Sequence, residues 1–218
     1  MKLLVPYYKS DSPKRQSELD YCLRQNLTNE HFDKIVVFFN DEVWKMASVY
    51  SSEMEVVKIK DRLTYERVFS WASTFASNDL CVMANSDIIF DDSIKMAEQV
   101  KENELVVVTR VELDQYSFKT NLPHSYIQDG FKVSIGPEIS HDAWIFRTPL
   151  PTFASNFQLG QLHCDGNLVR EAKRAGVDVS NGYKHIKAMH VHWSEFRTYD
   201  RYGYDVNNCG KVHRLWSP

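Results

Sequence analysis

The chain has 218 residues, of which 43% are hydrophobic and 25% charged, and its formal net charge is −3 at pH 7. This composition is typical of a globular protein with a buried core and excludes a low-complexity chain. The apolar runs are too short to cross a bilayer and the first residues lack the features of a signal peptide, so we expect a cytoplasmic protein. The four cysteines are widely separated, which excludes a C-x-x-C zinc site and a disulfide framework.

Hydrophobic periodicity predicts strands that alternate with helices over the first 112 residues. The strands of this half are predicted at residues 2–8, 34–40, 55–60, 80–84 and 104–112. The helices are predicted after Ser12-Pro13, near 42–47, from Thr64 onward and over 92–101. Such alternation favours an α/β fold of the Rossmann type, with a mostly parallel central sheet flanked by helices.

Beyond residue 112 the alternation stops. Residues 113–140 indicate a long loop, and the elements expected after it are a strand at 143–146, a helix at 165–175, a strand at 177–179 and an extended segment at 186–193. The chain shows neither internal repeats nor a linker. We therefore expect a single domain over residues 1–218.

The polar triplet Asn85-Ser86-Asp87 directly follows the strand at residues 80–84. The five apolar residues of that strand indicate burial on both faces, and ligands of open α/β sheets bind at the carboxyl ends of such strands. Asn85 and Asp87 are two apart on extended backbone, so both could present oxygen ligands to Mg²⁺ or Mn²⁺. The alternative is that they shape a turn before the next helix.

Other chemically capable side chains follow the neighbouring strands. Tyr7 and Tyr8 end the first predicted strand, and Arg62 follows the third. An aromatic ring to stack on a base, an arginine for phosphate and the carboxylate of Asp87 would together form a nucleotide-diphosphate site. The ordinary alternatives are a rim tyrosine and a solvated arginine.

The last third of the chain supplies two further candidates. His190 and His192 are two apart on an extended segment and project to one face, so one of them could complete a metal shell with Asp87. Imidazole nitrogen would favour Mn²⁺ over Mg²⁺. Asp165 stands where a helix begins, and it is either an N-cap or a general base for an acceptor hydroxyl.

Six blocks in order along nearly the whole chain resemble a family of small nucleotide-sugar glycosyltransferases with the GT-A fold. The blocks are Val5-Pro6-Tyr7-Tyr8, Arg62-Leu63-Thr64-Tyr65, Ala84-Asn85-Ser86-Asp87-Ile88-Ile89-Phe90-Asp91, Ser140-His141-Asp142-Ala143-Trp144-Ile145-Phe146, Cys164-Asp165 and His190-Val191-His192-Trp193-Ser194-Glu195. Two positions depart from the family pattern. Asn85 replaces the first acid of the D-x-D metal motif, and Gly166 stands where the relatives have Asn.

The resemblance implies a single GT-A-like domain with a nucleotide-binding half, 1–112, and an acceptor-binding half, 113–218. It implies that Asp87 and Asp165 are catalytic and that Mn²⁺ or Mg²⁺ is held by Asp87, His190 and His192. The residues expected to bind the nucleotide are Pro6, Tyr7, Tyr8, Arg62, Tyr65, Asn85 and Ser86. Those expected to bind the acceptor are His141, Asp142 and Trp144.

The expected function is transfer of a sugar from a nucleoside-diphosphate sugar, with a UDP-sugar as first choice, to a hydroxyl acceptor. A glycan is the default acceptor, and the excess of Lys and Arg after residue 165 leaves room for a hydroxylated DNA base. One alternative is a non-catalytic nucleotide-sugar-binding module, with Asn85 marking lost metal affinity. A nucleotidyltransferase ranks lower, since it would need a glycine-rich phosphate loop and the chain has no glycine before Gly130.

Overall fold

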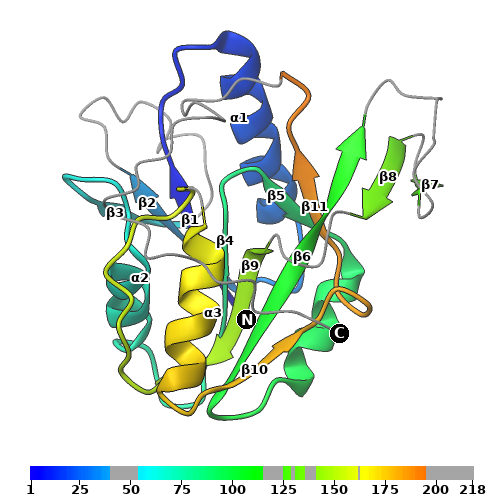
Figure 1. The fold of residues 1–218 in the computed structure, drawn as a ribbon. Helices are drawn as coiled ribbons and strands as arrows, with labels where there is room; N and C mark the ends of the chain where they lie inside the picture. Colours follow the sequence, from blue (N-terminus) through cyan, green and yellow to red (C-terminus); the bar gives the residue numbers. More distant parts are fainter. Residues whose placement is uncertain (40–53, 115–124, 129–130, 136–140, 162, 195–218) are drawn as a thin grey trace.

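The computed structural model describes residues 1–39, 54–114, 125–128, 131–135, 141–161 and 163–194. A central sheet carries helices on both faces (Figure 1). The strands are β1 (Lys2–Tyr7), β2 (Lys34–Phe39), β3 (Met54–Lys58), β4 (Leu80–Ala84), β5 (Ile88–Phe90), β6 (Glu104–Asp114), β7 (Ser125–Gln128), β8 (Phe131–Ile135), β9 (His141–Arg147), β10 (Asp178–Asn181) and β11 (Ala188–Val191). The helices are α1 (Pro13–Leu27), α2 (Tyr65–Ala72), the 3₁₀ helix η1 (Asp92–Gln99) and α3 (Cys164–Arg174). The predicted α/β class is confirmed.

The sheet follows the order β3-β2-β1-β4-β9-β6-β11-β5, with β10 and β8 also paired to β6 and β7 paired to β8. β3, β2, β1 and β4 are mutually parallel. β9 lies antiparallel between β4 and β6, so β4 and β6 run the same way, and β11 is parallel to β6. The carboxyl ends of β1, β4, β6 and β11 therefore reach one edge of the sheet.

The two larger of the three hydrophobic clusters in the described residues lie on opposite faces of this sheet. The face covered by α1 and η1 buries Leu19, Leu23 and Ile94 against odd-numbered residues of β1 such as Leu3. The face covered by α2 and α3 buries side chains that include Tyr65, Val68, Leu168 and Ala172. The two sets alternate along β1, β2, β4, β6 and β9, as period-two side chains on a doubly covered sheet must. Within the described residues, none of the helices is long and apolar enough to cross a membrane.

Local sequence explains where α1 begins and which face it buries. Pro13 opens the helix, and the Ser12 side chain caps it by accepting a hydrogen bond from the backbone N–H of Arg15. The buried face of α1 also carries polar residues. Asn26 donates to the carbonyl of Ile88 at 2.8 Å and accepts from the N–H of Phe90, which fixes β5 beneath the helix.

The pairing of β6 with β9 contains an irregularity at the edge described above. Val108 pairs with Ala143, but the next residue, Thr109, pairs with His141. β9 therefore has one extra residue, Asp142, between two residues that pair with consecutive residues of β6. Such an extra residue is a β-bulge. Bulges redirect side chains, and this one lies where several polar residues meet.

Two sequence expectations differ from the structure, one short strand was not expected, and one expected helix lies outside the described residues. The interval 113–140, expected to be a loop, contains the end of β6 and the hairpin strands β7 and β8. The signal is the Asp129-Gly130 pair between two short alternating segments, a common hairpin turn sequence. The helix expected at 92–101 is 3₁₀, and the three-residue strand β5 is too short for periodicity to reveal. The helix expected near 42–47 lies outside the described residues.

Candidate metal and nucleotide site

Asp87 lies just beyond the carboxyl end of β4 and meets the C-terminal histidines. The ligand atoms of Asp87, His190 and His192 all lie within 4.8 Å of one another. The backbone N–H of Val191 donates to the carbonyl of Asp87 at 2.8 Å, which anchors β11 to the β4–β5 turn. Asp87 and His190 are buried, while His192 is half-buried. The structure thus brings together the three residues expected to hold a metal.

A basic residue that the sequence did not single out also reaches Asp87. Arg15 donates from Nη2 to Oδ2 of Asp87, and from Nη1 to Glu18 at 2.9 Å and to the carbonyl of Val191 at 3.2 Å. Glu18 in turn accepts hydrogen bonds from the N–H and hydroxyl of Ser194. The buried face of α1 therefore supplies a guanidinium to the site and ties the segment after β11 to the helix.

A chain of polar contacts leads from His190 back to β4. Nδ1 of His190 lies 2.6 Å from Oε2 of Glu112, its direct partner in the β11–β6 pairing. Arg110 donates from Nε to Glu112 at 2.5 Å and from Nη1 to Asp142 at 3.0 Å. Asn85 completes the chain, because its Nδ2 donates to Oδ1 of Asp142 at 2.5 Å. The side-chain amide of Asn85 is therefore hydrogen-bonded to Asp142, the extra residue of the β-bulge.

These contacts set the charges of the site. Burial alone would raise the pKa of the Asp87 carboxyl, but His190 and Arg15 hold that pKa well below its usual range. Burial would likewise lower the pKa of His190, whereas Asp87 and Glu112 raise it to about 10. Burial would raise the pKa of Glu112, but the contacts of this carboxyl with His190 outweigh burial and lower its pKa. Near neutral pH the site thus contains two carboxylates around an imidazolium.

Asp142 behaves differently from the other two acids. Its burial raises the pKa of the carboxyl, and the neighbouring Arg110 offsets this only in part. Two donors nevertheless satisfy its oxygens, one from Arg110 and one from Asn85. Asp142 is therefore enclosed by its own chain, whereas the acceptor contact expected of it would require an open carboxylate.

The donor set fits a divalent cation. Asp87 offers an ionised oxygen ligand and the two histidines offer ring nitrogens, and within the described residues Oδ1 of Asp87 accepts no hydrogen bond. Glu112 receives the other nitrogen of His190, the arrangement in which metal-bound histidines are usually found. A cation at this position would compete with Arg15 for Asp87, and it would replace the proton on Nε2 of His190.

Asp165 lies in the first turn of α3, close to the start of β9. Its Oδ2 accepts a hydrogen bond from the backbone N–H of His141 at 3.0 Å, and Nδ1 of His141 lies 3.8 Å away. Asp165 is half-buried and is not the helix cap, since the N-cap position is His163. The carboxylate is therefore held at the same edge as the bulge residue Asp142.

Two other expected site residues lie inside the core. Tyr65 and Trp144 are both fully buried, with ring centroids 5.1 Å apart. The hydroxyl of Tyr65 lies 3.3 Å from Sγ of Cys164, at the start of α3. Both rings are therefore core residues in this structure, with no surface exposed to solvent.

The residues at the end of β1 divide into buried and accessible ones. Tyr7 is 4% exposed, donates its hydroxyl proton to Asp20 and accepts from Nε2 of Gln16 at 2.7 Å. Pro6 and Tyr8, by contrast, are half-buried, as are Asn85 and Ser86 beyond the end of β4. Of the two tyrosines, Tyr8, which directly follows β1, is thus the one that keeps more surface exposed to solvent.

Arg62 is exposed but engaged by the chain. It donates from Nε to the carbonyl of Leu159 at 2.9 Å and from Nη2 to that of Gly160 at 3.0 Å. Gly160 has φ +69°, and a Cβ there would lie 2.9 Å from Nη2 of Arg62. The positive φ favours glycine at that turn, whereas the end of the Arg62 side chain could move aside for a Cβ. The two hydrogen bonds of Arg62 thereby hold Leu159 and Gly160, which precede α3, in place.

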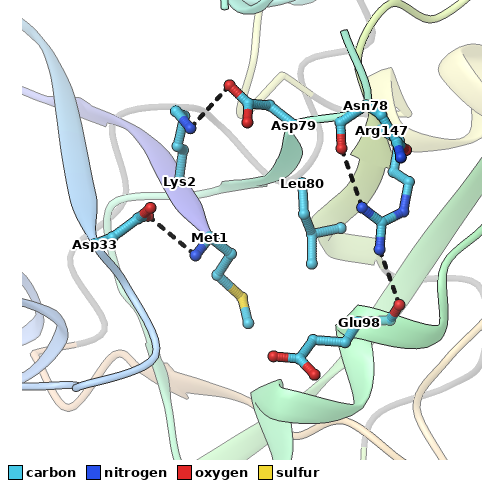
Figure 2. A pocket seen from close by; sticks show the side chains of 8 residues that line it. All are labelled: Met1, Lys2, Asp33, Asn78, Asp79, Leu80, Glu98 and Arg147. Carbon is cyan, nitrogen blue, oxygen red and sulfur yellow. Dashed lines mark hydrogen bonds and ion pairs between the residues drawn. The ribbon is translucent and has the colours of Figure 1, made fainter. Parts of the chain in front are cut away.

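A small cavity of about 260 Å³ lies at the opposite edge of the sheet, near the amino ends of β1 and β4 (Figure 2). Its charged groups pair with one another: the terminal amine with Asp33 at 3.0 Å and Lys2 with Asp79 at 2.9 Å. Arg147 donates to the carbonyls of Asn78 and Glu98. Figure 2 shows these contacts between residues that line the cavity. The amine of Met1 and the side chains of Lys2 and Arg147 are therefore used within the fold.

Comparison with known proteins supports the fold. No protein-family model matches the sequence, and no curated protein matches it. The structure of the inositol-1-phosphate CTP transferase from T. maritima aligns with a TM-score of 0.50 at 12% identity, over 90% of this chain and 91% of that one. The 4-diphosphocytidyl-2C-methyl-D-erythritol synthase from Anaerococcus prevotii aligns with a TM-score of 0.47 at 13% identity, over 88% and 87%. At this identity the T. maritima match shows a shared Rossmann-like fold, and neither protein is named as a glycosyltransferase.

Proposed function

We propose that this protein is a divalent-metal-dependent transferase that uses a nucleoside-diphosphate sugar and passes the sugar to a hydroxyl acceptor. The observation that carries the proposal is the grouping of Asp87 with His190 and His192 at the carboxyl edge of the sheet. A mixed set of oxygen and nitrogen donors suits Mn²⁺ better than Mg²⁺, which prefers oxygen ligands. Asp165 supports the proposal from the same edge.

In this mechanism the chain's own groups bind, orient and move one proton. Asp87, His190 and His192 would hold the cation, which when bound neutralises the charge that develops on the departing diphosphate. Tyr8 would stack on the base. The bond between the anomeric carbon and the diphosphate oxygen breaks as the acceptor oxygen bonds to that carbon. Asp165 takes the acceptor's hydroxyl proton on the oxygen that the N–H of His141 leaves free.

Nucleotidyl transfer is the second candidate, and a specific observation favours it. The T. maritima protein whose fold aligns with this chain is named as a CTP transferase. An enzyme of that kind would join a nucleoside triphosphate to a sugar phosphate and release pyrophosphate. This likeness supports nucleotidyl transfer more than glycosyl transfer. The connection from β1 to α1 points the other way, because residues 8–12 contain no glycine with which to wrap a triphosphate.

One experiment separates the two reactions. The protein with Mn²⁺ is offered UDP-, GDP-, CMP- and dTDP-sugars while nucleotide release is measured, and in parallel nucleoside triphosphates with sugar 1-phosphates while pyrophosphate is measured. Glycan and hydroxymethylated duplex DNA are included as acceptors. Asp87→Asn and Asp165→Asn are the test variants. Asp178→Asn is the matched control, because Asp178 is an exposed acid on β10.

The proposal expects nucleotide release that falls at least a hundredfold in Asp87→Asn and in Asp165→Asn and stays at the parental rate in Asp178→Asn. Release of pyrophosphate would instead establish the second candidate. Parental turnover in both folded test variants would refute the mechanism. Nucleotide binding that is indifferent to Mn²⁺, without turnover of any donor, would leave the non-catalytic binding module as the function.

A further inference from the structure

The ring of His190 lies between two carboxylates. Nε2 is 3.1 Å from Oδ2 of Asp87, and Nδ1 is 2.6 Å from Oε2 of Glu112. An ionised carboxylate can only accept hydrogen bonds, so the nitrogen that faces Glu112 must carry a proton. A histidine with a protonated Nδ1 has only Nε2 to offer a metal.

Glu112 is held in place by more than its contact with His190. The two residues are direct partners in the parallel pairing of β6 with β11, so their side chains leave the sheet together. Arg110, two residues earlier on the same face of β6, donates to Glu112 at 2.5 Å and to Asp142 at 3.0 Å. The carboxylate of Glu112 is thus fixed from one side while it fixes the imidazole on the other.

We infer that Glu112, braced by Arg110, is a positioning residue that orients His190 with Nε2 toward Asp87. Glu112 is absent from the group of ligand atoms around Asp87, so its effect on a cation passes through His190. The inference rests on the proposed function, because it takes His190 as a metal ligand. Removing such an outer partner of a metal-bound histidine typically weakens metal affinity about 10- to 100-fold.

Mn²⁺ alone is the probe. Its binding is monitored through the loss of the electron paramagnetic resonance signal of free Mn²⁺. Glu112→Met keeps the length of the side chain and removes the acceptor, and we expect it to weaken binding at least tenfold. Glu112→Gln keeps an acceptor oxygen for Nδ1 and should stay within about threefold of the parent. Glu102→Gln, at an exposed site before β6, makes the same change of charge and should leave binding unchanged.

A second readout reports the imidazole itself. In ¹⁵N-histidine-labelled, metal-free protein, the His190 resonances are identified by their loss in His190→Asn. The parent should show protons on both ring nitrogens, because each nitrogen faces a carboxylate, and Glu112→Gln should keep the proton on Nδ1. Glu112→Met should lose the Nδ1 proton and keep the Nε2 proton that faces Asp87. A residue that merely stabilised the fold would not change this signature.

The outcomes separate the inference from the proposed function. Parental Mn²⁺ affinity in Glu112→Met, with affinity lost in His190→Ala, would overturn the positioning role and leave the metal site standing. Parental affinity in both Asp87→Ala and His190→Ala would overturn the metal site itself. Should Glu112→Met fail to fold, Arg110→Met removes the brace without touching His190. It should weaken Mn²⁺ binding several-fold, and parental affinity there would also overturn the inference.

Discussion

Arg15 of α1 and Asp87 of the β4–β5 turn lie 72 residues apart in the sequence and form a buried ion pair. Both side chains are almost completely withdrawn from solvent, at 6% and 11% exposure. Removing one partner of such a pair leaves a charge in a medium that solvates it poorly. The pair therefore links the stability of the metal-free protein to its affinity for a cation.

Arg15→Gln is expected to lower the free energy of unfolding of the metal-free protein by about 3 kcal/mol, because Asp87 and Glu18 then lose their shared cation. The same change should raise Mn²⁺ affinity, since a divalent ion no longer competes with the guanidinium. Urea unfolding with and without Mn²⁺ measures both effects. Lys14→Gln, an exposed neighbour with the same loss of charge, should show neither. Weaker Mn²⁺ binding in folded Arg15→Gln would contradict the competition.

Asn85→Asp restores the acid of the D-x-D motif, yet we expect it to destabilise the protein by about 1–3 kcal/mol. The amide of Asn85 donates to Asp142, so an aspartate there would set one carboxylate against another. The double variant Asn85→Asp/Asp142→Asn reverses the donor and the acceptor and should recover most of the loss. Thermal unfolding of the three variants provides the comparison. If Asn85→Asp alone is as stable as the parent and binds Mn²⁺ more tightly, the hydrogen bond from Asn85 to Asp142 is not needed for stability.

Tyr65→Phe and Tyr8→Leu test which tyrosine serves the nucleotide. Among the described residues the hydroxyl of Tyr65 contacts Cys164 alone, so Tyr65→Phe should cost less than about 1 kcal/mol of stability and leave nucleotide affinity unchanged. Tyr8 retains accessible surface, and the loss of a stacked ring there should weaken UDP binding about tenfold. Calorimetry with UDP measures both. Weakened UDP binding in Tyr65→Phe, with Tyr8→Leu unaffected, would reverse the assignment.

The thiols should stay unreactive until the protein unfolds. Burial raises the pKa of Cys81 to about 12 and of Cys164 to about 11, and it raises the pKa of Cys22 well above its ordinary value. The reactive thiolate is therefore scarce at pH 8, which lies below all three values. In Cys209→Ser, chosen because Cys209 lies outside the described residues, we expect no reaction with a disulfide reagent in native buffer and full reaction in denaturant. Fast reaction of a thiol in native buffer would contradict the packing around it.

Much of the fold could be predicted because buried parallel strands are continuous apolar runs. The run that ends at Ala84 placed Asn85 and Asp87 at a strand end, and the spacing of His190 and His192 placed both on one face. What periodicity cannot show is which strand ends become neighbours. The antiparallel insertion of β9 between β4 and β6 is such a case, since it depends on pairing partners far apart in the chain.

Arg15 and Glu112 escaped prediction for a related reason. Arg15 stands four residues before Leu19 and seven before Cys22, so the helical period does place it on the buried face, yet nothing local names Asp87 as its partner. Tyr65 shows the converse. Its spacing to Val68 and Ala72 assigns it to the core, and only the family resemblance suggested a nucleotide contact.

Asp142 is the extra residue of the bulge on β9, so its loss would affect the two neighbouring strands differently. Because Val108 and Thr109 take Ala143 and His141 as successive partners, removing Asp142 would leave the β6–β9 ladder uninterrupted, whereas on the β4 side the backbone N–H of Asn85 would lose the Asp142 carbonyl, 3.0 Å away. Asp142, which accepts hydrogen bonds from both Arg110 and Asn85, is thus the extra residue of the bulge at this edge of the sheet. Deleting this one residue would therefore remove the carboxylate while β6 and β9 keep their phase.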